Sequence, residues 1–401
     1  MKYKYLFLAF LSPFLAYTQT NTNNQQRTDT IAGTAPIANY NTINPGKLLF
    51  DNNGHIINAH SAGLLYHNGT YYWFGEHKSE RSVMALVGVT VYSSKDLYNW
   101  KNEGIALSVS NDENSSIVRG CIIERPKVIY NEKTKTFVMY FHLELKGKHY
   151  DAALAGVATA KNVTGPYTFL KASRVNAGHW PMNVSKEQKN IVYDSIHYKD
   201  RSAPGWREAL VQGLYLKRDI EGGQMSRDMN LFVDDDKKAY HIYSSEENFT
   251  LHIAELTDDY LNYTGRYIRV APGGDNEAPA MFKKDGKYFM FASGTTGWAP
   301  NAARLLTADA IMGNWTQHPN PCVGEGAELT FRSQSTFVLP VQGKKNAFIF
   351  MGDRWIPENP IDSRYVWLPV KFKNGMPYLE WTGRWKLDIF DNPEQIFSKP
   401  E

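Results

Sequence analysis

Residues 63–74 have the sequence GLLYHNGTYYWF. A short apolar run is followed by a polar turn, Asn68-Gly69, and then by a second run that is rich in aromatic residues. An Asn-Gly pair between two such runs is the strongest short-range signal of a β-hairpin. We therefore expect two antiparallel strands here.

The same unit recurs four more times along the chain, at residues 127–141, 230–243, 280–291 and 336–350. Further strand-like text follows the hairpins, for example at residues 88–92, 155–158, 251–254 and 364–367. Four strands per unit, five units and almost no amphipathic helical pattern predict an all-β fold, a five-bladed β-propeller. We expect residues 46–401 to form this single domain. An insert near residues 170–225 has no clear periodicity, and we expect a lid or rim loop there.

The N-terminus predicts export. Residues 1–18 have the pattern of a signal peptide, with Lys2 and Lys4 before an apolar stretch and small residues before Gln19. Residues 19–45 are rich in Asn, Thr, Gln and Ala, and we expect a flexible leader. No later stretch of about 18 apolar residues follows, so we expect no membrane span and a secreted or periplasmic protein.

Charge and cysteine content exclude some classes of protein. The chain has 44 basic and 41 acidic residues without a basic run, which argues against a nucleic-acid partner. Neither a Gly-rich phosphate loop nor a G-x-S-x-G nucleophile turn is present. At this size no disulfide scaffold is needed, so we expect Cys121 and Cys322 to be buried free thiols, although their pairing stays open. We expect a monomer.

Polar residues precede the first strand of every hairpin. In a propeller the first strand of each blade lines the central channel, so these residues converge on one mouth. The positions three residues before the five units are His60, Glu124, Arg227, Glu277 and Ser333. The positions that follow them are Ser61, Arg125, Asp228, Ala278 and Gln334.

Three blades thus bring a carboxylate to one ring: Glu124, Asp228 and Glu277. Clustered carboxylates repel one another, which raises the pKa of at least one of them and suits it to act as a general acid. Glycoside hydrolysis needs an acid for the leaving oxygen and a second group for water or carbon. The alternative is that these residues cap strand ends or pair with Arg125 and Arg227.

Eight short motifs carry a family resemblance. They are NAHSAG (58–63), YYWFGE (71–76), SSKDLYNW (93–100), ERPK (124–127), SRDM (226–229), NEAP (276–279), TGW (296–298) and SQST (333–336). In this order they resemble glycoside hydrolase family 43, a family of five-bladed propeller enzymes. They look most like the branch of exo-β-1,3-galactanases and related galactosidases.

The resemblance implies an inverting enzyme with Glu277 as general acid and Glu124 as the residue that orients the acid and tunes its pKa. The family's usual base, an Asp on the first blade, is replaced here by His60-Ser61. The galactanase-like branch shares this loss, and a glutamine matching Gln334 is thought to hold the attacking water there. His60, Glu76 and Glu246 are the alternative bases.

The substrate-binding set completes the expected site. It consists of His60, Glu76, Arg125, Asp228, Glu246 and Trp298, with Trp298 as a sugar platform and with Trp355 and Tyr243 near the same rim. No cofactor is required. Some family members hold a cation such as Ca²⁺ in the channel, so a structural Ca²⁺ stays open.

The resemblance implies a secreted hydrolase for polysaccharide degradation that releases terminal galactose from β-1,3-galactan or arabinogalactan side chains. An α-L-arabinofuranosidase or a β-xylosidase of the same fold is the alternative within the enzymes. A non-catalytic carbohydrate-binding propeller is the alternative outside them.

Overall fold

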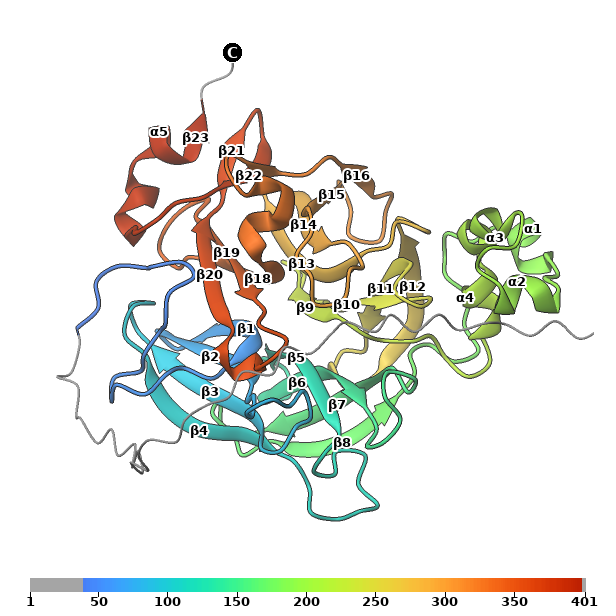
Figure 1. Cartoon of the computed structure of the whole chain (residues 1–401), viewed down its shortest axis with the longest axis horizontal. Helices are drawn as coiled ribbons and strands as arrows, with labels where there is room; N and C mark the ends of the chain where they lie inside the picture. The colour runs from blue at the N-terminus through green and yellow to red at the C-terminus, as the bar shows by residue number, and fades with distance from the viewer. Residues whose placement is uncertain (1–38, 399–401) are drawn as a thin grey trace, which may run out of the picture. The chain divides into compact units, whose positions relative to one another are not determined.

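The computed structural model describes residues 39–398, and these form a β-propeller (Figure 1). The first strands of five consecutive sheets contact one another in a closed ring, in the order β1, β5, β9, β13, β18 and back to β1. The predicted all-β propeller is therefore confirmed. The predicted signal peptide and residues 19–38 of the predicted leader lie outside the described residues.

Each of these five sheets is antiparallel and follows chain order from its first strand outwards. The first sheet contains β1 (His60–His67), β2 (Thr70–Glu76), β3 (Gly88–Ser94) and β4 (Lys101–Ser108). The second contains β5 (Ile122–Asn131), β6 (Thr136–Glu144), β7 (Leu154–Ala160) and β8 (Thr168–Ser173). The third contains β9 (Met229–Val233), β10 (Ala239–Ser245), β11 (Thr250–Leu256) and β12 (Tyr263–Val270). The fourth contains β13 (Glu277–Lys284), β14 (Lys287–Ser293), β15 (Arg304–Ala308) and β16 (Thr316–His318). The fifth contains β18 (Gln334–Pro340), β19 (Phe348–Arg354) and β20 (Arg364–Pro369).

The described residues form six sheets, so the predicted number of blades, five, is wrong. The sixth sheet contains β17 (Cys322–Val323), β21 (Lys371–Lys373), β22 (Met376–Glu380) and β23 (Phe397–Ser398). Two of its pairings are parallel, β17 with β22 and β21 with β23. The hairpin pattern missed this sheet because its strands are very short and β17 lies far from the others in the sequence.

The core lies between neighbouring sheets, which explains why the second strand of each hairpin is apolar on both faces. Successive residues of a strand point to opposite faces. Trp73 therefore packs on Trp367 of the fifth sheet, with ring centroids 4.8 Å apart. Its neighbour Phe74 belongs to the cluster that contains Met139 of the second sheet.

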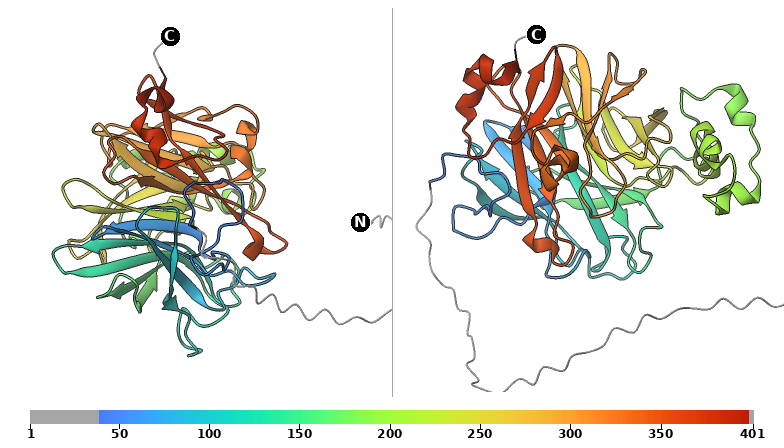
Figure 2. Two further views of the ribbon diagram at one scale, coloured as in Figure 1. Left: turned by 90° about the vertical axis from the view of Figure 1, so that its left-hand side faces the viewer. Right: turned by 45° about the horizontal axis from the view of Figure 1, so that its top comes forward.

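The insert between β8 and β9 is helical rather than a loop. It contains α1 (Lys186–Asn190), α2 (Ser195–Lys199), α3 (Trp206–Gln212) and α4 (Leu214–Arg218), and it projects from the side of the propeller (Figures 1 and 2). We call residues 186–218 the helical insert. Three short 3₁₀ helices, Ala327–Arg332, Pro360–Asp362 and Leu387–Asp391, and α5 (Pro393–Ile396) lie in the C-terminal third.

The ring closes by contacts between distant parts of the sequence. Ile43 forms two backbone hydrogen bonds with Trp385, of 2.8 and 3.0 Å, so the end of the predicted leader is packed. Ala59 N–H donates to the Tyr365 hydroxyl, and that hydroxyl donates to the Ile57 carbonyl. The two cysteines are buried and unpaired, as expected. None of the helices within residues 39–398 has the length and apolar character needed to cross a membrane.

Candidate active site

Most of the predicted ring residues line one pocket at the start of the five first strands. Its volume is about 220 Å³. The lining residues are Ser61, Glu76, Lys78, Glu124, Arg125, His142, Tyr150, Arg227, Asp228, Asn248, Glu277, Gly297, Trp298, Gln334 and Trp355. A second pocket of about 300 Å³ adjoins it and shares Trp298, Gln334 and Trp355.

A β-bulge near the start of the first strand lies beside the pocket in three sheets. Pairing with the second strand shifts register just after His60, Glu124 and Glu277. The residue that follows each of them is left-handed: Ser61 (φ 50°), Arg125 (φ 55°) and Ala278 (φ 53°). Bulges commonly redirect side chains next to active sites. The same backbone device therefore recurs in three sheets.

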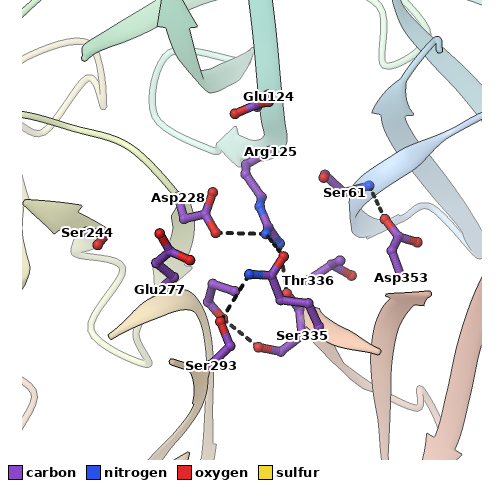
Figure 3. A network of polar contacts seen from close by, with 12 residues as sticks. Ser61, Glu124, Arg125, Asp228, Ser244, Glu277, Ser293, Ser335, Thr336 and Asp353 are labelled. Carbon is purple, nitrogen blue, oxygen red and sulfur yellow. Dashed lines mark hydrogen bonds and ion pairs between the residues drawn. The ribbon is translucent and has the colours of Figure 1, made fainter. Parts of the chain in front are cut away.

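Arg125 is the centre of the polar network (Figure 3). Its guanidinium donates to Asp228 at 2.7 Å, to the side-chain oxygen of Gln334 at 2.6 Å and to the Ser335 carbonyl at 2.8 Å. Its backbone N–H donates to Glu76 at 2.9 Å. Arg125 of the second sheet is thus bonded to Glu76 of the first sheet, to Gln334 and Ser335 of the fifth, and to Asp228 directly before the third.

The amide of Gln334 is held at both ends. Its Oε1 accepts hydrogen bonds from Arg125 and, at 3.1 Å, from the Trp355 indole. Its Nε2 donates to the Ser293 hydroxyl at 3.0 Å. One N–H of the Gln334 amide remains, so this side chain can donate a hydrogen bond that orients a water molecule. Both lone pairs of Oε1 are already used, so Gln334 cannot accept a proton from that water.

Glu124 is held in its ionised form. Burial opposes its charge, but the hydrogen bond and positive charge of His142, together with Lys78, lower the pKa of Glu124 to about 2. His142 Nδ1 lies 3.1 Å from Glu124, and its Nε2 lies 2.8 Å from Glu144. Burial disfavours the imidazolium, yet these two carboxylates raise the pKa of His142 to about 9. Tyr150 donates a further hydrogen bond to Glu124 at 2.8 Å.

Glu277 has the opposite ionisation. Burial, followed by the charge of Asp228, raises its pKa to about 8, although Arg125 and Arg227 oppose the shift. Glu277 Oε1 accepts a hydrogen bond from Asn248 Nδ2 at 2.7 Å. At neutral pH, one pocket therefore holds a protonated Glu277 and an ionised Glu124.

The pocket contains one group of candidate metal ligands, Glu124, His142 and Asp228, whose ligand atoms lie within 4.8 Å of one another. A metal ligand must be a neutral imidazole, because a protonated one has no lone pair. Both ring nitrogens of His142 instead contact carboxylates, Glu124 at 3.1 Å and Glu144 at 2.8 Å. Ca²⁺ also prefers oxygen ligands. These residues do not fit the Ca²⁺ that the sequence left open.

Most of the predicted site residues meet in this pocket. Glu277, Glu124, Gln334, Glu76, Arg125, Asp228 and Trp298 all line it. Glu76 forms an ion pair with Lys78. The half-buried Trp298 packs edge-to-face on Trp355, with centroids 5.1 Å apart.

Three predicted residues do not reach the pocket. His60 is fully buried and stacks on Tyr365 with centroids 5.0 Å apart, whereas its neighbour Ser61 lines the pocket. Burial lowers the pKa of His60 to about 3. Glu246 is fully buried in an ion pair with Arg269, with two contacts of 2.7 Å. Tyr243 is fully buried in the core. The roles predicted for them at the sugar are not supported by these positions.

Sequence reasoning missed His142, Tyr150, Asn248 and Lys78. A usable signal existed for the first, since the ring residues face second-strand partners across the hairpin: His60 with Glu76, Glu124 with His142, Glu277 with Ser293, and Gln334 with Asp353. Cross-strand partners lie on the same face of the sheet. Asp353 is also notable because burial raises its pKa to about 7.

Comparison with known proteins finds glycoside hydrolases. The model of glycosyl hydrolases family 43 matches residues 206–354. A β-D-galactofuranosidase of Aspergillus niger is 30% identical over 156 residues, which span 38% of this chain and 44% of that enzyme. The chain thus matches less than half the length of this curated relative.

Solved structures give longer matches. An exo-β-1,3-galactanase from Phanerochaete chrysosporium, solved with galactose, is 33% identical with a TM-score of 0.69 and covers 86% of this chain and 68% of its own. A GH43 β-1,3-galactosidase, solved with galactodeoxynojirimycin, has a TM-score of 0.84 and covers 86% of this chain. Because it is 55% identical over 100% of its own length, this chain belongs to glycoside hydrolase family 43.

Proposed function

We propose that this chain is an exo-acting glycoside hydrolase that releases terminal galactose from β-1,3-galactan or arabinogalactan side chains. The observation that carries the reaction is the opposite ionisation of Glu277 and Glu124 within one small pocket. Two carboxyl groups whose environments separate their pKa values are typical of an acid and its partner. The substrate is supported by the galactosidases and galactanases that the chain resembles.

Glu277 is the general acid in this proposal. Its proton passes to the glycosidic oxygen as the bond to the anomeric carbon breaks. The ionised Glu124 and Asp228 keep the pKa of Glu277 high. They also place negative charge near the oxocarbenium-like transition state.

Gln334 holds the attacking water through its remaining amide N–H. We assign the acceptance of the water's proton to Asp353, the cross-strand partner of Gln334, because Asp353 and Gln334 both line the adjoining pocket. Its pKa of about 7 allows ionisation near neutrality. Glu76 is already paired with Lys78, and His60 and Glu246 line neither pocket. Attack by a separate water inverts the anomeric configuration. A proton NMR time course should therefore show α-galactose as the first product from a β-linked substrate.

The test is hydrolysis by the wild type and by Glu277→Gln, with Glu325→Gln on an exposed loop as the matched control. The substrates are β-1,3-galactan, arabinogalactan, and the 4-nitrophenyl β-galactoside, α-arabinofuranoside and β-xyloside. We expect galactose from the wild type and the control only. Release of arabinose or xylose alone would show that the substrate is an arabinofuranoside or a xyloside. Galactan binding without hydrolysis would favour a non-catalytic carbohydrate-binding propeller.

We also propose export, a monomer and catalysis without a metal. Export is supported by the signal-peptide pattern of residues 1–18. Cell fractionation with N-terminal sequencing tests it, and finding the uncleaved chain in the cytoplasm would contradict it. Light scattering on the purified protein tests the monomer, which a dimer mass would overturn.

A further inference from the structure

The turn between β10 and β11 has an unusual backbone. Glu246, Glu247 and Asn248 are three consecutive left-handed residues, with φ of 52°, 60° and 69°. None of them is a glycine, and a side chain with a Cβ disfavours this conformation. Such strain persists only where surrounding contacts hold it, and it is concentrated at functional sites.

The turn is held from several directions. The carboxylate of Glu246 is paired with Arg269, whose guanidinium also donates to the Val211 carbonyl of α3 at 2.9 Å. Glu247 lies 3.0 Å from Arg218 at the end of α4 and 3.5 Å from Arg227. Two of these contacts connect the turn to the helices of the insert: Arg269 with Val211 of α3, and Glu247 with Arg218 of α4.

Aromatic packing adds to these ion pairs. Phe249, directly after the turn, packs edge-to-face on Trp206 of α3, with centroids 5.4 Å apart. It also stacks on Tyr215 of α4 at 6.2 Å and 13°. The helical insert therefore supports the turn on its apolar side as well.

The insert also holds the strand that carries the acid. Arg207 of α3 pairs with both carboxylate oxygens of Asp275, at 3.1 and 2.9 Å. Asp275 lies two residues before Glu277. The same helix thus fixes both the turn that ends at Asn248 and the approach to Glu277.

Asn248 and Glu277 meet in a single hydrogen bond of 2.7 Å, from Asn248 Nδ2 to Glu277 Oε1. An amide nitrogen can only donate, and the carbonyl oxygen of a protonated carboxyl group is a better acceptor than its hydroxyl oxygen, so this contact favours Oε1 as the oxygen without the proton. The acid's proton then lies on Oε2. Without this contact, either oxygen could carry it.

We propose that Asn248 is a positioning residue that fixes the proton of Glu277 on Oε2, and that the helical insert holds Asn248 in place for this purpose. The inference rests on the proposed function, since it concerns the acid of that reaction. Asn248 acts through Glu277, so its loss should affect only substrates whose leaving group needs a proton.

The first experiment compares wild type with Asn248→Gly on β-1,3-galactan and on 2,4-dinitrophenyl β-galactoside, whose phenolate leaves without protonation. Glycine accepts the φ of 69°, so the exchange removes the side chain without adding strain. Asn374→Gly, at an exposed left-handed residue with φ 52°, is the matched control.

We expect kcat on galactan to fall about 100-fold in Asn248→Gly, the scale of a misplaced catalytic group. On the dinitrophenyl substrate, kcat should stay within about threefold of wild type, because general-acid assistance is not needed. An equal loss on both substrates, or a change in KM alone, would overturn the inference in favour of a direct sugar contact. Inactivity of the wild type on both substrates would instead defeat the proposed function.

The second experiment removes support from outside the pocket, in Phe249→Ala and Arg207→Ala. Thermal unfolding first identifies which variant remains folded at the assay temperature. We expect the folded variants to lose activity on galactan and retain it on the dinitrophenyl substrate. Wild-type activity on galactan in both would overturn the role of the insert.

Discussion

Asp228→Asn should shift the pH dependence of the enzyme. The charge of Asp228 is the largest single charge effect that raises the pKa of Glu277, after burial. Removing one nearby charge changes a pKa by about 1 to 3 units. The freed charge of Arg125 acts in the same direction. The pKa of Glu277 should therefore fall from about 8 to between about 5 and 7.

The consequence follows from the protonated fraction of Glu277. At pH 7, a pKa of 8 leaves about 90% of the acid protonated, whereas values of 7 to 5 leave about 50% to 1%. The rate at pH 7 should fall about 2- to 100-fold from this cause, and the loss should shrink towards pH 5. A lost sugar contact would lower the rate equally at every pH.

The assay is kcat/KM on β-1,3-galactan between pH 4 and 10, which reports the ionisation of the free enzyme. Asp258→Asn, on an exposed carboxylate paired with Lys133, is the control and should keep the wild-type profile. If the alkaline limb of Asp228→Asn stays near pH 8, either Asp228 is not coupled to Glu277 or that limb does not report Glu277. Either result refutes the reasoning.

Four further outcomes follow from the structure. Trp298→Ala should raise KM for galactan about tenfold with kcat retained, as expected for lost sugar binding; an unchanged KM in steady-state assays would contradict the platform role. Glu246→Gln should lower the free energy of unfolding in urea by about 3–5 kcal/mol, because it leaves the buried Arg269 without its partner; a loss below about 1 kcal/mol would contradict this. EDTA should leave kcat/KM unchanged, since protonated His142 is no ligand, and a loss restored by Ca²⁺ would show otherwise. Glu277 has a raised pKa, so its contribution to stability is lost as pH rises from about 4.5 to about 8. The melting temperature of Glu277→Gln should therefore rise relative to that of the wild type across this pH range. A difference in melting temperature that is the same at every pH would be inconsistent with the raised pKa.

The sequence predicted the elements that have a local signal. Turn residues such as Asn68-Gly69 mark each hairpin, and the strands that flank them are long enough to show their pattern. The helices of the insert are five to seven residues long. A helical repeat needs a window of about 11 to 18 residues, so no periodicity was visible. These helices are stabilised by tertiary packing, for example of Trp206 on Phe249.

The site was predictable where the repeat itself positions residues. Counting back from each hairpin located Glu124 and Glu277, each directly before a β-bulge of the first strand. The same bulge follows His60, but there the imidazole stacks on Tyr365 and only Ser61 lines the pocket, which the count could not reveal. The prediction for Glu246 was wrong for another reason. Its partner, Arg269, lies on β12, and no local pattern reveals an ion pair across two strands.

The contacts that close the ring have a consequence for synthesis of the chain. The first sheet is completed by residues about 300 positions later, since Ala59 bonds Tyr365 and Trp73 packs on Trp367. When the ribosome has made only the first sheet, neither of the sheets that pack against it, the second and the fifth, has yet been made. A chain that stops before Trp385 also loses the partner of Ile43. Truncation at the C-terminus should thus unfold the first sheet along with the last, and a split protein should regain activity only when both fragments are present.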